Sequence, residues 1–445
     1  MLTVIKAFLE IVTCISLIFF PLPERQCNPE FNGTFIQSWM SSSWDDERWQ
    51  KEFDVMEQAG IEYLIIQDIA SKSTDGSWTL YYNSALPVFD NADRSGSDVI
   101  EAALKNSRGH NIKIFVGLGL FDNWWTTAGF GDEYSDFCDI SSDMIKEIHQ
   151  KYGDRYSDAF YGWYFTPEIS NGPQMKLSTV QIAKGINRII DAINETDSDR
   201  PLLLSPFYTQ FGANPSIESA KLTWAAFIKA VNFRPQDILC PQDAVGAGWT
   251  LEENLINVWR MYSQALKLSG KDIHLWANCE NFTSYNADSV ISGWITPFPS
   301  ENRHYVTATL DRFCRQMDIA SRYVENIITF SYNHYYSPEY VDPMFHNTYI
   351  DYIENGHVLE SEAPSVPTDF CATPSDNGTQ LRWEPSSDNF GVAYYRICKN
   401  GNFLVRIEYF EDTEFTDPDS TDGAVYTITA YDAAGNASAD VEITA

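Results

Sequence analysis

Tyr63-Leu64-Ile65-Ile66 and Ile112-Lys113-Ile114-Phe115-Val116 are the segments that decide the fold of this chain. Each is a short and nearly continuous apolar run, which is typical of a strand buried on both faces in a parallel sheet. Similar segments recur between residue 33 and about residue 335. The eight expected strands are 34–39, 61–67, 112–118, 160–166, 201–206, 237–241, 272–278 and 326–331.

Helical patterns lie between these strands, at 45–59, 98–107, 141–152, 178–194, 218–231, 251–268 and 302–323. Gly60, Gly109 and Gly270 stand where the C-caps of such helices belong. An open doubly wound sheet would show a glycine-rich phosphate turn after its first strand, but residues 37–43 read Q-S-W-M-S-S-S. The alternation therefore predicts an α/β fold, a closed (β/α)8 (TIM) barrel over residues 28–360.

The stretch S-E-A-P-S-V-P, residues 361–367, marks a boundary between the barrel and a second domain, 361–445. This domain contains short alternating strands at 380–383, 393–399, 403–407, 425–431 and 440–444, which predict an all-β sandwich. Its segment Y-T-I-T-A-Y-D-A-A-G-N-A-S, together with Trp383 and the turn T-E-F-T-D, resembles a fibronectin type III domain. The resemblance implies a spacer, with a carbohydrate-binding module as the alternative.

The composition narrows the range of partners. Acidic residues outnumber basic ones 62 to 30, and the net charge of −32 disfavours nucleic acids and anionic lipid surfaces. The eight cysteines are scattered, with no C-x-x-C pair and no clustered histidines, so we expect no metal site and no cofactor. One disulfide bridge among these cysteines is left as an alternative. We expect a monomer.

The N-terminus carries Lys6 and then an apolar run from Ala7 to Phe20, closed by Pro21. This run is too short for a comfortable membrane span and fits the apolar region of a signal peptide. Residues 1–27 are therefore expected to be a signal peptide or an uncleaved anchor, and the protein to be secreted or held at the surface of a bacterial cell.

Two expected strands deliver a carboxylate at their C-terminal ends, where the active site of a (β/α)8 barrel lies. The fourth reads Y-G-W-Y-F-T-P-E and ends at Glu168, and the seventh reads L-W-A-N-C-E and ends at Glu280. A pair of carboxylates is what a glycosidase needs, about 5–5.5 Å apart for retention and about 6.5–9.5 Å apart for inversion. Either residue alone would be an ordinary solvated acid.

The arrangement resembles the large clan of barrel glycosidases with an acid/base on strand four and a nucleophile on strand seven. The resemblance implies that Glu168 is the acid/base and Glu280 the nucleophile. The clan usually has Asn before the acid/base, where this chain has Pro167, so a sugar contact made by that amide must come from elsewhere, for example from Asn278 or Asn281. The motifs G-T-F-I-Q-S-W, G-W-Y-F-T-P-E and W-A-N-C-E-N-F also resemble a little-characterised bacterial family of glycosidase-like barrels.

Other polar and aromatic residues near the strand ends are candidates for sugar contacts, because sugar rings stack on flat aromatic side chains. We expect Asp243 either to orient the nucleophile or to bind a hydroxyl, and Trp163 and Tyr164 to bury Glu168 and raise its pKa. The candidate contacts are Gln37, Trp39, Asp68, Trp124, Trp125, Tyr208, Gln242, Asp243, Trp276, Asn278, Asn333 and His334. Further tryptophans expected in loops of this face are Trp44, Trp78, Trp249 and Trp294.

These features lead to the hypothesis of a secreted retaining glycoside hydrolase that cleaves a polysaccharide or oligosaccharide, and the many tryptophans favour endo action. A non-catalytic carbohydrate-binding barrel, such as an adhesin or a polysaccharide-assembly partner, is the main alternative. A barrel hydrolase for another substrate is disfavoured by the lack of a G-x-S-x-G elbow or a metal-ligand cluster. A purely structural surface protein is the remaining alternative.

Overall fold

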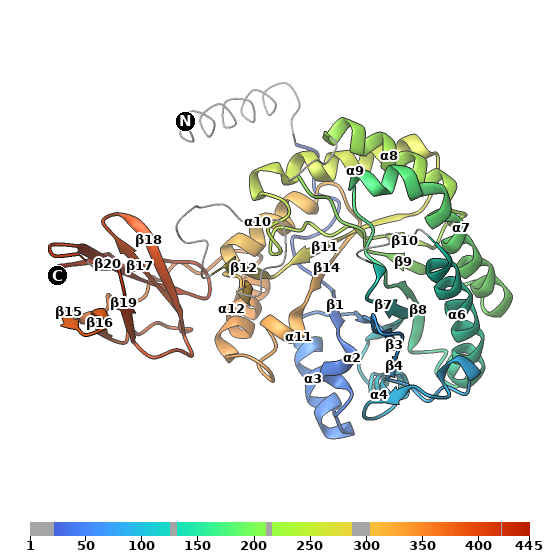
Figure 1. Cartoon of the computed structure of the whole chain (residues 1–445), viewed down its shortest axis with the longest axis horizontal. Coiled ribbons are helices and arrows are strands. Elements are labelled where there is room, and N and C mark those ends of the chain that lie inside the picture. Colours follow the sequence, from blue (N-terminus) through green and yellow to red (C-terminus); the bar gives the residue numbers. More distant parts are fainter. Residues whose placement is uncertain (1–21, 125–130, 211–215, 287–302, 420) are drawn as a thin grey trace.

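The computed structural model describes residues 22–124, 131–210, 216–286, 303–419 and 421–445 (Figure 1). Residues 1–21, which hold the expected signal segment, lie outside this range. No helix in the described part of the chain is long and apolar enough to span a bilayer.

The larger domain is a closed barrel of parallel strands, as expected. Its strands are neighbours in the order β1-β14-β11-β10-β9-β8-β6-β2, and β2 pairs again with β1. Their bounds are β1 Gly33–Ile36, β2 Tyr63–Ile66, β6 Lys113–Gly117, β8 Phe160–Phe165, β9 Leu202–Leu204, β10 Ile238–Leu239, β11 His274–Glu280 and β14 Asn326–Phe330. All eight expected strands are therefore confirmed, each within a few residues of its expected bounds.

Helices surround the barrel (Figure 1). Their bounds are α3 Asp46–Gln58, α4 Val99–Asn106, α6 Asp132–Ile148, α7 Pro173–Thr196, α8 Ile217–Ala230, α9 Leu255–Ser269, α10 Leu310–Ala320 and α12 Pro343–Glu354, with the short helices α2 Ser38–Ser41 and α11 Tyr332–Tyr335 at strand ends. Gly270 ends α9 in the left-handed conformation, as its expected role as a C-cap requires.

Two expected helices are wrong at their start. The helix expected over 141–152 begins earlier, at Asp132 of α6. The helix expected over 302–323 begins only at Leu310, because Arg303–Thr307 form strand β13. This strand pairs antiparallel with β12, Phe282–Asn286, so a hairpin directly follows the strand that carries Glu280. A small extra sheet of β3 Ala70–Lys72, β4 Trp78–Leu80, β5 Asp93–Arg94 and β7 Gly119–Phe121 was also not expected.

Alternate residues of the barrel strands point inward and outward, as the pleat of a strand requires. The inward set includes Phe35, Ile65, Phe115, Tyr164, Leu203, Ile238, Cys240, Trp276 and Ile328, which form one apolar cluster. A second and larger cluster lies between the strands and the helices. The barrel is therefore a packed core and not a pore.

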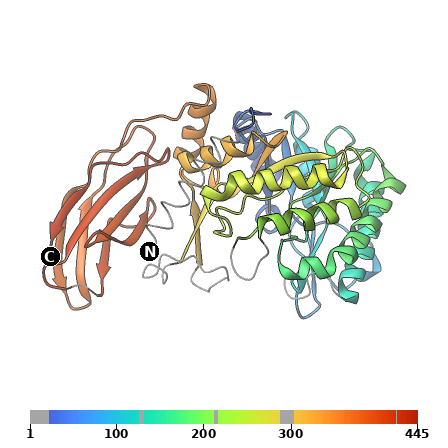
Figure 2. The same cartoon turned by 90° about the horizontal axis from the view of Figure 1, so that it is seen from above.

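The C-terminal part consists of two antiparallel sheets (Figure 2). One contains β15 Thr368–Ser375, β16 Gly378–Glu384 and β19 Glu414–Asp417; the other contains β17 Val392–Lys399, β18 Asn402–Glu408, β20 Val425–Asp432 and β21 Val441–Thr444. Trp383, Tyr395 and Tyr426 belong to its own buried core. The sandwich expectation is confirmed to this extent, and it lies beside α10 and α12 of the barrel (Figure 1). The seven cysteines of the described residues carry free thiols.

Candidate active site

Glu168 lies three residues beyond the end of β8, at the C-terminal end of the barrel. Its Oε1 accepts a hydrogen bond of 3.1 Å from Nε2 of Gln242, which follows β10. Burial raises the pKa of Glu168, and the hydrogen bond from Gln242 partly opposes this effect. Tyr164 points into the barrel next to Glu168, whereas Trp163 points outward and packs edge-on against Phe160 at 4.9 Å. The expected burial of Glu168 by Trp163 is thus corrected.

Glu280 is the last residue of β11 and only 3% of its surface is exposed. Its Oε2 accepts a hydrogen bond of 2.6 Å from the backbone N–H of Ala247. Gly246 allows this approach, because a Cβ there would lie 2.9 Å from the Cβ of Glu280 and 2.4 Å from the carbonyl oxygen of Phe282. The loop after β10 therefore wraps closely around the carboxylate and fixes one of its oxygens.

Asp243 lies beneath Glu280 and is completely buried. Its carboxylate accepts hydrogen bonds from Nε2 of Gln316 at 2.5 Å and from the backbone N–H of Glu280 at 3.3 Å. Of the two roles expected for Asp243, binding a sugar hydroxyl is excluded by its burial. Its contacts instead connect α10 to the end of β11.

The charges around Glu280 are close enough to influence one another. The pKa of Glu280 is raised, first by burial and then by the negative charge of Asp243. The N–H of Ala247 and the guanidinium of Arg312 act in the opposite direction, and the charge of Glu168 raises the pKa slightly further. Glu168 and Glu280 thus lie at the same end of the barrel, near enough for the charge of one to affect the pKa of the other.

Asp68 adds a further carboxylate to this end of the barrel. It follows β2 and is 9% exposed, and none of the described side chains or backbone groups donates a hydrogen bond to its carboxylate. Burial raises the pKa of Asp68 to about 7. The hydroxyl of Tyr164 lies within electrostatic range of both Asp68 and Glu168. Gln37, at the N-cap of α2 on the neighbouring strand end, is partly exposed.

A row of aromatic rings extends from this site over the ends of β1, β14 and the β12–β13 hairpin. We call it the aromatic strip. Neighbouring ring centroids are 5.3–5.9 Å apart in the pairs Trp39–His334, His334–Tyr340, His334–Tyr335, Tyr335–Phe282 and Phe282–Tyr305. Trp39, Tyr340 and Tyr305 are 55%, 52% and 49% exposed, so the strip presents aromatic rings to solvent. Most neighbouring rings are tilted or edge-on, at 50° between Trp39 and His334 and 74° between Phe282 and Tyr305. Burial lowers the pKa of His334 to about 4, so this ring is neutral.

Several expected sugar contacts are instead parts of the core. Trp276 packs against Tyr63 at 5.0 Å and pairs in register with Asn326, the first residue of β14, so it lies toward the opposite end of the barrel from Glu280. Asn278 is 2% exposed and donates to Ser205 inside the barrel. Both side chains point into the barrel below Glu280, so neither is a substrate contact as expected.

Other expected contacts are buried for a different reason, because they pack outside the barrel. Tyr208 is 6% exposed and belongs to the cluster between strands and helices. Trp124 is 3% exposed, and its Nε1 donates a hydrogen bond of 2.8 Å to the carbonyl of Glu168, so it supports the backbone of that residue. Asn333 is also buried and donates to Glu52. Trp125 and Trp294 lie outside the described residues.

Two side chains of α10 were missed by the sequence reasoning. Arg312 donates to the carbonyls of Glu280 and Phe282, at 3.3 and 2.5 Å, and Gln316 donates to Asp243 and to the carbonyl of Glu280. Their spacing of four residues on a helix was the available signal, since it places both on one face. The aromatic residues Tyr305 and Tyr340 of the strip were also missed.

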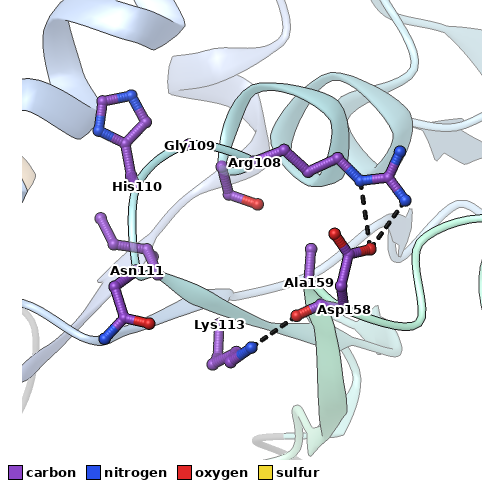
Figure 3. A pocket seen from close by; sticks show the side chains of 9 residues that line it. Arg108, Gly109, His110, Asn111, Lys113, Asp158 and Ala159 are labelled. Carbon is purple, nitrogen blue, oxygen red and sulfur yellow. Dashed lines mark hydrogen bonds and ion pairs between the residues drawn. The ribbon is translucent and has the colours of Figure 1, made fainter.

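A surface pocket lies at the other end of the barrel, where β6 and β8 begin (Figure 3). Its charged side chains are already paired: Arg108 with Asp158 at 2.7 Å, and Lys113 with the carbonyl of Asp158 at 2.6 Å. This end contributes to stability in barrels of this kind, whereas catalysis uses the other end. Within the described residues, no group of three or more His, Cys, Asp or Glu side chains could hold a metal ion.

Comparisons with solved structures show the barrel fold. A protein described as a "putative alpha-L-fucosidase" from Bacteroides thetaiotaomicron VPI-5482 is 18% identical, with a TM-score of 0.58 over 74% of this chain and 94% of that one. Chitinase ChiA74 from Bacillus thuringiensis is 11% identical, with a TM-score of 0.40 over 94% and 84% of the two chains. A family 1 β-glucosidase from Thermotoga maritima is 9% identical, with a TM-score of 0.45 over 76% and 100%.

No curated protein matches the sequence. Residues 31–342, which contain the whole barrel with Glu168 and Glu280, match the family described as "Domain of unknown function (DUF4434)". The chain therefore belongs to the DUF4434 family.

Proposed function

We propose that this protein is a retaining glycoside hydrolase, with Glu280 as the nucleophile and Glu168 as the acid/base. The observation that carries the proposal is the pairing of these two carboxyl groups at the C-terminal end of one barrel, within electrostatic range of each other. The solved structure described as a "putative alpha-L-fucosidase", which has a similar barrel, is named as a glycosidase, and this agrees with the proposal.

Glu168 suits the role of the acid. Its carboxyl group is recessed beside Tyr164, and burial raises its pKa, so it holds a proton at a higher pH than an exposed glutamate does. In the first step this proton goes to the glycosidic oxygen while the bond from that oxygen to the anomeric carbon breaks. The departing alcohol leaves Glu168 ionised and ready to act as a base.

Glu280 suits the role of the nucleophile. The N–H of Ala247 fixes Oε2, and Oε1 accepts no hydrogen bond from the described residues, so Oε1 is the oxygen that can bond to the anomeric carbon. Burial and the negative charge of Asp243 raise the pKa of Glu280 to about 8, which disfavours its ionised form in the free protein. The positive charge that develops on the sugar ring acts in the opposite direction and favours ionised Glu280. In the second step Glu168 takes a proton from water, and the hydroxide oxygen displaces Glu280 from the anomeric carbon.

The substrate we favour is a polysaccharide or oligosaccharide cut within the chain. Trp39, Tyr340 and Tyr305 expose their rings along the aromatic strip. Four successive ring contacts link Trp39 to Tyr305, which favours stacking of more than one sugar ring. The buried carboxylate of Asp68 receives no hydrogen bond from the part of the chain that the structure describes, and it is suited to accept one from a sugar hydroxyl in the site.

The test compares Glu280→Ala and Glu168→Gln with the parent on a panel of polysaccharides and aryl glycosides that includes an α-L-fucoside. Each substitution should lower kcat by about a thousandfold or more. Glu62→Gln, an exposed glutamate at the amino end of β2, is the control and should leave kcat unchanged. Proton NMR of the first product tests retention of the anomeric configuration. Equal rates in parent and both variants would refute the assignment.

The non-catalytic carbohydrate-binding barrel remains the second candidate, because the aromatic strip would serve binding alone equally well. Calorimetric titration of the parent with the same polysaccharides separates the two functions. Binding that is lost in Trp39→Ala, without any hydrolysis by the parent, would favour the binding protein.

A further inference from the structure

The C-terminal sandwich makes a specific contact with α10 of the barrel. The backbone N–H groups of Leu310 and Asp311, at the start of this helix, donate to the carbonyls of Ala433 and Ala434, at 2.8 and 2.9 Å. The first N–H groups of a helix have no partner within it, and Thr309 at the N-cap provides no side-chain hydrogen bond. The sandwich therefore supplies the N-terminal cap of α10.

The turn that reaches α10, residues 432–436, is shaped for this contact. The carboxylate of Asp432 accepts hydrogen bonds from the N–H groups of Gly435 and Asn436, at 2.6 and 2.8 Å. Gly435 has φ of +104°, and a Cβ there would lie 2.2 Å from Oδ1 of Asp311. A residue with any side chain at 435 would thus be strained in itself and would also push the turn away from α10.

Two further contacts join the same parts. Arg406 of β18 donates to the carbonyl of Thr307, the last residue of β13, at 3.4 Å. The hydroxyl of Tyr409 accepts from the N–H of Asp342, and its ring packs against Phe345 of α12 with centroids 5.8 Å apart. Figures 1 and 2 both show the sandwich against this side of the barrel. The sandwich is therefore docked on the barrel at several points.

Two side chains of α10 contact the candidate active site. Arg312 and Gln316, one helical turn apart, donate to the carbonyl of Glu280. Gln316 also holds the carboxylate of Asp243. One short helix thus receives its cap from the sandwich and fixes the backbone and the charges around Glu280.

We propose that the C-terminal sandwich is a positioning element of the active site: its 432–436 turn holds α10 in place, and α10 in turn places Arg312 and Gln316 against Glu280 and Asp243. This inference rests on the proposed function for its catalytic meaning. It assigns the sandwich a role that differs from both a spacer and a sugar-binding module.

The test uses Gly435→Ala in the full chain, with Gly423→Ala as the matched control. Gly423 lies in the same domain with φ of +77°, but a Cβ there meets nothing within 4 Å, so the control shares the backbone strain without touching the barrel. Hydrogen exchange is measured over residues 310–316 and over the loop 244–248. Both segments should exchange about tenfold faster in Gly435→Ala than in the control.

Kinetics provide the second readout. Gly435→Ala should lower kcat about tenfold while KM stays within about twofold, because the sugar contacts are intact and the reacting carboxylate is misplaced. The acid limb of the kcat/KM profile should move to higher pH, since Arg312 no longer opposes protonation of Glu280. Asn436→Ala, which removes a 2.8 Å hydrogen bond from the turn to Glu360, should act in the same direction and serves if Gly435→Ala does not fold.

The inference is overturned if Gly435→Ala exchanges faster over 310–316 while its exchange over the loop 244–248 and its pH profile are the same as in the control. If the parent hydrolyses no glycoside, the proposed function fails, while the exchange of the loop 244–248 still decides whether the sandwich supports the site. The two failures are therefore distinguishable.

Discussion

Asp68→Asn should make the protein more stable at pH 8 and leave it unchanged near pH 3. The carboxyl of Asp68 has a pKa of about 7 in the folded chain, against 3.8 for a free aspartate. At about 1.36 kcal/mol per pH unit, this difference corresponds to about 4 kcal/mol. The Asp68 carboxyl releases its proton near pH 4 in the unfolded chain and only near pH 7 in the folded chain. The free energy of unfolding of the parent therefore falls by about 4 kcal/mol as the pH rises between those values. Asn cannot ionise and avoids the loss.

The assay is urea denaturation at pH 3, 5 and 8, followed by tryptophan fluorescence. Asp417→Asn is the control with the opposite sign, because Lys399 and Tyr426 bind the Asp417 carboxylate and its pKa is lowered. That variant should lose stability at neutral pH. If Asp68→Asn is as stable as the parent at pH 8, or less stable, the inference that burial of the Asp68 carboxylate destabilises the folded chain at this pH is wrong.

Two further predictions concern activity. Gly246→Ala should lower kcat by about a hundredfold, because the new Cβ would lie 2.4 Å from the carbonyl of Phe282 and displace the loop that fixes the nucleophile. Gly119→Ala, whose Cβ would make an ordinary contact at 3.5 Å, should keep the parent rate in the same steady-state assay, and equal rates for both variants would contradict the prediction. Trp39→Ala should raise KM about tenfold at constant kcat, through the loss of a stacking surface. Phe410→Ala removes a ring of the sandwich that is 69% exposed, more than Trp39; should it raise KM as much, the role of the aromatic strip is refuted.

The barrel could be predicted because its strands are buried on both faces. Such strands read as continuous apolar runs, for example Tyr63–Ile66, and their order along the chain is their order around the barrel except at the closure. Glu168 and Glu280 could be placed at one end for the same reason, since both follow directly on such runs. Strand β13 was missed because Arg303–Thr307 has a partner only in the hairpin after Glu280, and periodicity does not reveal pairing.

The surroundings of the carboxylates were harder to predict, because they depend on which way side chains point. Trp276 and Asn278 stand two positions apart on β11 and both face the barrel interior, below Glu280, so nearness in sequence did not make them sugar contacts. Arg312 and Gln316 lie more than thirty residues after Glu280 and reach it only through the packing of α10. Such contacts follow from tertiary structure and have no local signature.

The tightly packed aromatic rings at the amino end of the barrel have a consequence for how this protein can change. Tyr63, Tyr161, Phe115 and Trp276 close that end with ring centroids 5.0–6.3 Å apart, and they do so without any residue of the candidate site. The aromatic packing that stabilises the barrel thus lies at its amino end, whereas buried carboxyl groups that cost stability, such as that of Asp68, lie at its carboxyl end. Residues at the polar rim can therefore diverge, or be randomised in a library, to accept new sugars while the scaffold that presents them stays intact.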